Sequence, residues 1–197
     1  MQLALPRTSG WGGPRKGAGA KKKQGSRVQH RPRLRFRKQS VHVTLRLRVG
    51  VWNLRSRRCF TALQRAFRAG KDRFGFRLCH FAIEGNHLHF IVEAGDHTEL
   101  SRGLQGLNIR MAKALNRLMR RRGSVFAGRY HAHVLRTPTE VRNALRYVLG
   151  NHAIHVRRQG RVPSLEIDPY CSLATVEDQL TMPPRTFLLQ RVLAQGG

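Results

Sequence analysis

No aspartate or glutamate precedes Asp72, so the first third of the chain carries no negative side chain. The whole sequence has 38 Lys and Arg against 10 Asp and Glu, a formal net charge of +28, and more than half of these basic residues come before Asp72. Solubility requires far less charge than this. The imbalance predicts a polyanionic partner, and it favours nucleic acid over an anionic membrane.

Long apolar runs and paired cysteines are also missing. No stretch of about 18 apolar residues could span a bilayer, and no basic amphipathic helix precedes the core as a membrane anchor. We therefore expect no membrane partner. The opening MQLALPRTSGWGG has too short an apolar run for a secretory signal, which favours a cytoplasmic location. Cys59, Cys79 and Cys171 are odd in number and widely spaced, so we expect buried free thiols rather than disulfides or a CxxC zinc site.

The chain divides by composition into an arm, one domain and an extension. Residues 1–39, with the run GWGGPRKGAGAKKK, show no helical or strand periodicity, and we expect a disordered basic arm there. This arm is either a solvated tail that adds nonspecific affinity or a segment that enters a groove or follows a hairpin stem. Residues 40–156 form the expected domain, since 197 residues with 40% hydrophobic content suit one core. Residues 157–197 are a C-terminal extension.

Apolar periodicity predicts the elements of this domain. Residues 40–49, SVHVTLRLRV, alternate strictly as in a half-buried strand, and residues 76–84 and 87–94 form a hairpin around an EGN turn. Helices are expected over 56–70 and 97–122, followed by a strand over 125–135. The segment TPTEVRNALRYVLGN then begins a last helix, with Thr137 as N-cap, Pro138 at the first position and Glu140 at the third.

The order of these elements predicts an α+β fold. Its first six elements match the ferredoxin-like split pattern, an antiparallel sheet with two helices on one face. The first and third strands should be central neighbours, which leaves the opposite sheet face open. That open face should carry four polar side chains from the two strands, namely Arg46, Arg48, His87 and His89.

Two pairs of residues stand out as candidates for chemistry. In HLHFIV, His87 and His89 share one face of a strand. On the last helix Tyr147 and Asn151 are four residues apart, so they lie together on the flank of its apolar stripe. Taken singly, two such histidines can serve packing or hydrogen bonding, and the other pair can be a buried tyrosine and a C-terminal asparagine cap.

Both motifs resemble those of one family. HLHFIV resembles the HUH motif (His, hydrophobic, His) of single-tyrosine transposases, and NALRYVLGN resembles the tyrosine helix of REP-associated tyrosine transposases. The likeness runs from about residue 40 to 155, with weaker likeness in the basic arm and in DPYCSLA. EGN stands where the family usually has a Met-Pro-Asn-like turn. The resemblance implies an HUH endonuclease-like fold with a catalytic C-terminal helix, Tyr147 as nucleophile, and a divalent metal, Mg²⁺ or Mn²⁺, held by His87, His89 and Asn151.

The function implied is that of a metal-dependent single-stranded DNA endonuclease and strand transferase. It would act near REP-like hairpins of bacterial genomes through a 5′-phosphotyrosine intermediate, as a monomer or homodimer associated with the nucleoid. Aromatic residues such as Phe36, Trp52 or Tyr130 could stack on bases. Basic side chains would hold the DNA backbone, and the candidates are Arg15, Lys16, Lys21, Lys22, Lys23, Arg46, Arg48 and Arg129.

Several alternatives stay open. RYHAHV carries a second pair, His131 and His133, also one residue apart on an expected strand. Imidazole also suits Zn²⁺. The protein could be a noncatalytic nucleic-acid-binding protein with the same basic face, or a rolling-circle-type nickase with HUH chemistry. The larger relaxases place their tyrosine ahead of the histidines, whereas Tyr147 follows His87 and His89, which favours the transposase branch.

Overall fold

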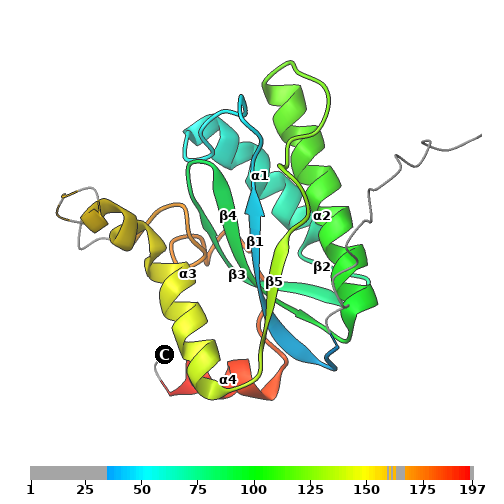
Figure 1. Cartoon of the computed structure of the whole chain (residues 1–197), viewed down its shortest axis with the longest axis vertical. Helices are drawn as coiled ribbons and strands as arrows, with labels where there is room; N and C mark the ends of the chain where they lie inside the picture. Colours follow the sequence, from blue (N-terminus) through cyan, green and yellow to red (C-terminus); the bar gives the residue numbers. More distant parts are fainter. Residues whose placement is uncertain (1–34, 159, 161, 163–166, 196–197) are drawn as a thin grey trace, which may run out of the picture. The chain divides into compact units, whose positions relative to one another are not determined.

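The computed structural model describes residues 35–158, 160, 162 and 167–195 (Figure 1). Most of the expected basic arm lies outside this part, including the candidate DNA-binding residues Arg15, Lys16, Lys21, Lys22 and Lys23. The elements follow in the order β1 (Gln39–Arg46), α1 (Arg57–Gly70), β2 (Asp72–Arg73), β3 (Phe76–Ile83), β4 (His87–Ala94), α2 (His97–Leu118), β5 (His131–Leu135), α3 (Pro138–Arg158) and α4 (Phe187–Ala194).

The strands form one five-stranded antiparallel sheet in the order β2-β3-β4-β1-β5. β1 and β4 are neighbours at its centre, as predicted for the first and third expected strands. Their register pairs Arg46 with His87 and Thr44 with His89. Because paired residues point to the same face, these four side chains share one side of the sheet. The predicted α+β class with an antiparallel sheet is confirmed.

The first face of the sheet packs on α1 and α2. The alternating apolar residues of β1 and β4 point into this core. They are fully or almost fully buried: Val41, Val43, Leu45, Leu88, Phe90 and Val92. Both helices start at capping residues. The side chain of Ser56 accepts a hydrogen bond from the Cys59 N–H at 3.3 Å, and that of Asp96 accepts one from the Thr98 N–H at 2.7 Å.

The second face, which was predicted to be open, carries α3 and also α4, a helix that the sequence did not predict. The apolar stripe of α3 joins residues of the sheet and of α4 in a second core, whose members include Ile91, Leu135, Val141, Leu145, Val148, Leu189 and Val192. Residues of the C-terminal extension enter both cores: Leu180 is buried in the first, and Leu189 and Val192 are buried in the second. The open face is therefore covered along the part that α3 and α4 occupy.

The segment between α2 and β5 differs from the prediction. α2 ends at Leu118 rather than near 122, and β5 begins only at His131, whereas a strand was expected from about 125. Arg120 has a φ of 50° and Gly123 a φ of 95°, and this left-handed backbone stops the helix. Arg48, expected on the strand face, lies beyond the end of β1, where its N–H donates to the carbonyl of Val125 at 2.9 Å.

The cysteines have the predicted state. Cys59, Cys79 and Cys171 are all buried free thiols. Burial raises the pKa of the thiol in both Cys79 and Cys171, so these two side chains resist ionisation. Within the described part of the chain, no helix combines the length and the apolar character needed to cross a membrane.

Candidate active site

His87 and His89 lie on one face of β4, as their spacing predicts. Their ring centroids are 4.8 Å apart and their planes are perpendicular. His89 is 3% exposed, whereas His87 is half-buried near the start of the strand. The strand thus places two of the proposed metal ligands side by side, one at depth and one nearer to solvent.

Contacts to Nδ1 orient both imidazoles. Nδ1 of His87 donates to Oδ1 of Asn86 at 2.8 Å. Nδ1 of His89 lies 3.2 Å from Oγ1 of Thr44 and 3.3 Å from Nε2 of His42. A metal-binding histidine commonly engages its second ring nitrogen in this way, which fixes the tautomer and the ring orientation. The donor set therefore fits a cation that binds through the Nε2 atoms of His87 and His89.

Tyr147, the predicted nucleophile, packs its aromatic ring on these histidines. Its ring centroid is 5.1 Å from that of His89 and 5.7 Å from that of His42, with edge-on geometry in both contacts. α3 presents this flank because Val148 and the rest of its apolar stripe are held in the second core. Tyr147 is 40% exposed, so its phenol is both packed on the histidines and reachable from solvent.

Helix α3 begins as the sequence predicts. The N–H of Glu140 donates to Oγ1 of Thr137 at 3.2 Å, and Oε2 of Glu140 accepts from the Thr137 N–H at 3.0 Å, which completes a capping box. The helix then continues through Asn151, one turn after Tyr147. The side chain of Asn151 lies outside the described residues, so its role as a metal ligand stays a prediction.

His42 is a member of this cluster that sequence reasoning did not single out. Strand alternation placed it on the correct face of β1, but only the sheet register brings its ring into contact with both the ring of His89 and the ring of Tyr147. Burial, and then the charges of His133 and His131, lower the pKa of His42 to about 4. His42 is thus a neutral imidazole at neutral pH.

The rival pair, His131 and His133, lies on the same sheet face but on the outer strand. In the register of β5 and β1, His131 is opposite Thr44 and His133 is opposite His42. Both rival histidines are exposed, and Nε2 of His133 is 3.4 Å from Oε1 of Glu140. β1 therefore separates the two pairs. The ring contacts of Tyr147 with His89 favour the pair on β4 as the reactive one.

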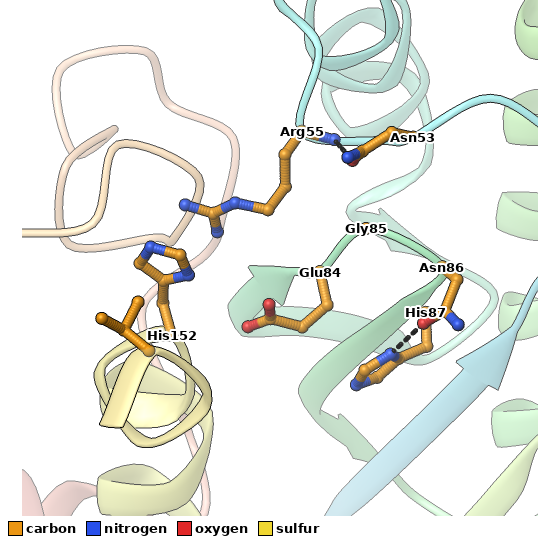
Figure 2. Close-up of a pocket in the computed structure, with 8 residues that line it drawn as sticks. Asn53, Arg55, Glu84, Gly85, Asn86, His87 and His152 are labelled. Carbon is orange, nitrogen blue, oxygen red and sulfur yellow. Dashed lines mark hydrogen bonds between the residues drawn. The ribbon is translucent and has the colours of Figure 1, made fainter. Parts of the chain in front are cut away.

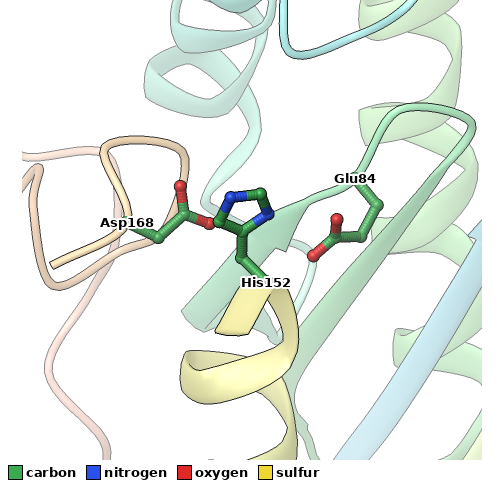
Figure 3. A group of neighbouring side chains, drawn as sticks. All are labelled: Glu84, His152 and Asp168. Atoms are coloured by element: carbon green, nitrogen blue, oxygen red, sulfur yellow. The ribbon is translucent and has the colours of Figure 1, made fainter. Parts of the chain in front are cut away.

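A second polar group was not predicted. Glu84, His152 and Asp168 bring one possible ligand atom each to within 4.8 Å of one another (Figure 3), so this group could hold a metal ion. Both guanidinium Nη atoms of Arg55 contact the carboxylate of Asp168, at 2.7 and 2.9 Å. The three residues come from the end of β3, from α3 and from the C-terminal extension. Because these residues are far apart in the sequence, no local motif predicts that they form a group.

A cavity of about 270 Å³ lies between this group and the histidine pair (Figure 2). It is bounded by the loop before α1, by the turn between β3 and β4, and by α3. Its lining residues are Asn53, Arg55, Glu84, Gly85, Asn86, His87, His152 and Val156. Since His87 is both a lining residue and a proposed metal ligand, the cavity adjoins the candidate reaction centre.

The described basic and aromatic candidates lie in different settings. Arg46, Arg48 and Arg129 are exposed, and Arg46 is directly opposite His87. Trp52 is 45% exposed. Phe36 and Tyr130 instead pack against the first core. Arg46 is thus the described basic candidate next to the histidine pair, and Trp52 is the aromatic candidate with a large exposed fraction.

Comparison with solved structures finds the same fold in a REP-associated tyrosine transposase bound to a REP hairpin. The TM-score is 0.60 and the identity 15%, over 79% of this chain and 89% of that one. A protein named as a candidate transposase of Deinococcus radiodurans R1 matches at a TM-score of 0.43 and 12% identity, over 74% of this chain and 100% of that one, which is too low to carry an argument. No family model matches the sequence, and neither does any curated protein. The fold implied by the two motifs is confirmed.

Proposed function

We propose that the chain is a metal-dependent single-stranded DNA endonuclease and strand transferase that uses Tyr147 as its nucleophile. The observation that carries this proposal is the packing of the Tyr147 ring on His89, 5.1 Å between centroids, with His87 beside it. Sequence motifs about 60 residues apart thus meet in one place. A role in core packing alone would not require a tyrosine that is 40% exposed.

The proposed metal ligands are His87, His89 and Asn151. Two neutral imidazoles and an amide oxygen would leave a cation its full charge and open coordination positions, which suits Mg²⁺ or Mn²⁺ although imidazole also binds Zn²⁺. When bound, the cation would withdraw negative charge from the scissile phosphate, an effect worth several kcal/mol in a transition state. Asn86, Thr44 and the ring of His42 would hold the two imidazoles in place through Nδ1.

Tyr147 would perform the covalent step. Its phenolic oxygen forms a bond to phosphorus while the bond from phosphorus to the 3′ oxygen breaks. The phenol loses its proton, and the departing strand takes one up as a free 3′-hydroxyl. The product is a 5′-phosphotyrosine that retains the energy of the phosphodiester. Attack by a 3′-hydroxyl on this intermediate reverses the step and joins strands.

DNA with a hairpin and a single-stranded flank is the proposed substrate. The solved structure with the same fold is bound to a REP hairpin, and the charge of +28 suits a polyanion. Arg46, opposite His87, would contact the backbone next to the scissile phosphate, and Trp52 could stack on a base. The corresponding cellular setting is the bacterial cytoplasm, in association with the nucleoid.

Trapping of the covalent intermediate tests the proposal. A labelled hairpin with a 5′ extension is incubated with the protein and Mg²⁺ or Mn²⁺, and the mixture is then denatured and separated by electrophoresis. We expect a slower-migrating adduct that carries the 3′ part of the substrate. Tyr147→Phe removes only the hydroxyl, so this variant should keep hairpin binding and lose the adduct.

Tyr130→Phe is the matched control. It removes the same group from a tyrosine whose hydroxyl lies 3.2 Å from Oγ of Ser101, away from the histidine pair on β4. This variant should form the adduct as the unmodified protein does. Cleavage without any adduct, or an adduct that persists in Tyr147→Phe, would rule out Tyr147 as the nucleophile.

A further inference from the structure

The segments that follow β1 and α2 meet at one end of the sheet. Because the strands are antiparallel, the end of β1 lies beside the starts of β4 and β5. The N–H of Arg48 donates to the Val125 carbonyl at 2.9 Å. The N–H of Trp52 donates to Sδ of Met119 at 3.4 Å. The two segments therefore contact each other in the upper part of Figure 1, where β1 and α2 end.

Both segments are dense in arginine. Residues 46–58 and residues 117–129 hold five arginines each and no acidic residue. Two of these arginines serve the fold, since Arg55 binds Asp168 and Arg121 donates to the Ser124 carbonyl at 3.1 Å. We use the name arginine surface for six of the exposed ones: Arg48, Arg57, Arg58, Arg117, Arg120 and Arg122.

Acidic side chains gather at the other end of the sheet. Glu93 lies near the end of β4, Asp96 caps α2 and Glu140 caps α3. Glu84 and Asp168 do lie at the same end as the arginine surface, but they belong to the group around His152 on the α3 side. The field of the domain is thus uneven, and it should draw a polyanion toward the arginine surface.

Helix stability accounts for only part of this surface. Arg117, Arg120 and Arg122 lie at or just beyond the C-terminal end of α2, where the helix dipole stabilises cations. Arg57 and Arg58 instead occupy the first turn of α1, where the dipole disfavours cations, and that turn has no acidic residue. Their position costs helix stability, and a bound anion would offset that cost.

We propose that the arginine surface binds the duplex stem of the DNA hairpin. The choice of partner rests on the proposed function, under which the substrate is a hairpin with a single-stranded flank. A duplex carries phosphates on two strands, and guanidinium groups spread over two segments can contact both of them. Such contacts hold the stem in place without reading its sequence.

A single strand fits this surface less well. Proteins that bind single strands present successive aromatic rings on which the bases stack. Within these two segments, which the structure describes throughout, Trp52 is the one aromatic residue that is largely exposed, at 45%. The guanidinium carbon of Arg58 lies 5.8 Å from the centroid of its ring. The surface thus offers many phosphate contacts and little stacking.

A stem bound here would lead to the proposed reaction centre. Trp52 is followed by Asn53 and Arg55, which line the cavity beside His87 (Figure 2). The unpaired flank at the foot of the stem would cross this loop to reach the histidine pair. The arginine surface and the reaction centre would therefore hold neighbouring parts of one substrate.

The test measures the binding of each part of the substrate in EDTA. One fluorescein-labelled probe is a blunt hairpin without a flank, and the other is a thymine-only strand without a stem. A fourfold variant replaces surface arginines by glutamine: Arg58→Gln, Arg117→Gln, Arg120→Gln and Arg122→Gln. It should bind the blunt hairpin roughly tenfold more weakly and lower the salt slope by about three to four units, because each phosphate contact contributes about 0.9. Its affinity for the thymine strand should stay within about threefold.

A matched control removes the same amount of charge elsewhere. It replaces four exposed arginines outside the two segments: Arg73→Gln, Arg102→Gln, Arg185→Gln and Arg191→Gln. This variant should keep the salt slope of the unmodified protein to within about one unit. The comparison separates direct contact with the stem from a general loss of positive charge.

Chemical protection examines the unmodified protein, so this arm does not depend on the folding of a variant. Phenylglyoxal modifies accessible arginine side chains, and mass spectrometry locates the modified residues. The blunt hairpin should protect the arginine surface and leave the four control arginines reactive.

Three results would overturn the inference: equal losses of affinity for the blunt hairpin and the thymine strand, equal hairpin affinity in the two fourfold variants, or an arginine surface that stays reactive when the hairpin is bound. The proposed function fails separately. A protein that binds the stem on this surface but forms no Tyr147 adduct keeps the stem site and loses the transferase. A protein that forms the adduct while the surface stays reactive does the reverse.

Discussion

The imidazoles of His42 and His89 lie against each other across the central strand pair, with Nε2 of His42 3.3 Å from Nδ1 of His89 and ring centroids 5.4 Å apart. Oγ1 of Thr44 approaches the same Nδ1 atom at 3.2 Å. Two neighbours on β1 therefore hold one ring on β4. This arrangement makes the orientation of His89 depend on side chains that need not touch metal or DNA.

Replacing Thr44 by valine should weaken metal binding. The change keeps the shape of the side chain but removes the hydroxyl that holds Nδ1 of His89, and loss of such a contact typically lowers metal affinity by about 10- to 100-fold. Isothermal titration with Mn²⁺ measures the effect. Thr61→Val is the control, since that hydroxyl donates to the Arg57 carbonyl on the exposed side of α1. Equal Mn²⁺ affinity in the two variants would show that Thr44 does not position the ligand.

Substitution of the histidine pairs decides which one serves the reaction. His87→Ala or His89→Ala should abolish cleavage and leave hairpin binding within about tenfold, because the proposed ligands act on the phosphate rather than holding the duplex. The double variant of His131 and His133 should still cleave. Gel assays of cleavage and binding on the same hairpin separate the two effects. The opposite pattern would move the metal site to β5.

Binding of DNA should depend steeply on salt. Each phosphate that a lysine or arginine neutralises releases counterions, so the logarithm of the affinity should fall linearly with the logarithm of the salt concentration. Deletion of residues 1–39 should reduce this slope by several units, since the basic side chains are concentrated there. Anisotropy titrations over a range of NaCl concentrations give both slopes. A flat response would remove nucleic acid as the partner.

Acidification should destabilise the fold through His80. Burial lowers its pKa to about 4 from the ordinary value of 6.5, against a smaller opposite effect of Glu93. The unfolded chain therefore takes up this proton more readily, so the stability from neutral His80 is complete above about pH 6.5 and is lost as the pH falls toward 4. Urea midpoints should decline less between pH 7.5 and 4.5 in His80→Gln than in the unmodified protein.

The control for this experiment is His97→Gln, which makes the same substitution at the first residue of α2. It should follow the pH dependence of the unmodified protein. Parallel urea curves for His80→Gln and the unmodified protein across this pH range would contradict the assignment to His80.

The structural features that the sequence predicted correctly depend on residues only a few positions apart. Strand alternation put His87 and His89 on one face, and the spacing of Thr137 and Glu140 predicted the capping box that starts α3. Both follow from geometry within a few residues. The expected fold could therefore be assembled from the order of the elements.

Features that depend on register or on distant segments could not be predicted in this way. His42 meets His89 only because of the pairing of β1 with β4, and Glu84 meets Asp168 only when the extension folds back on the domain. α4 is eight residues long, and its apolar residues Leu189 and Val192 become informative only against α3. The early end of α2 coincides with left-handed backbone at Arg120, and arginine is not a residue type that predicts such a turn.

The contact between Tyr147 and His89 also bears on how copies of the protein would divide the work. Both residues belong to one chain, in which the ring of Tyr147 on α3 contacts the ring of His89 on β4. A single protomer would thus hold the proposed nucleophile and the proposed metal ligands together, so a dimer would contain two whole centres rather than two shared ones. If subunits lacking the Tyr147 phenol are mixed with subunits lacking the His89 imidazole, no complete centre would then form, and the mixture would not regain cleavage.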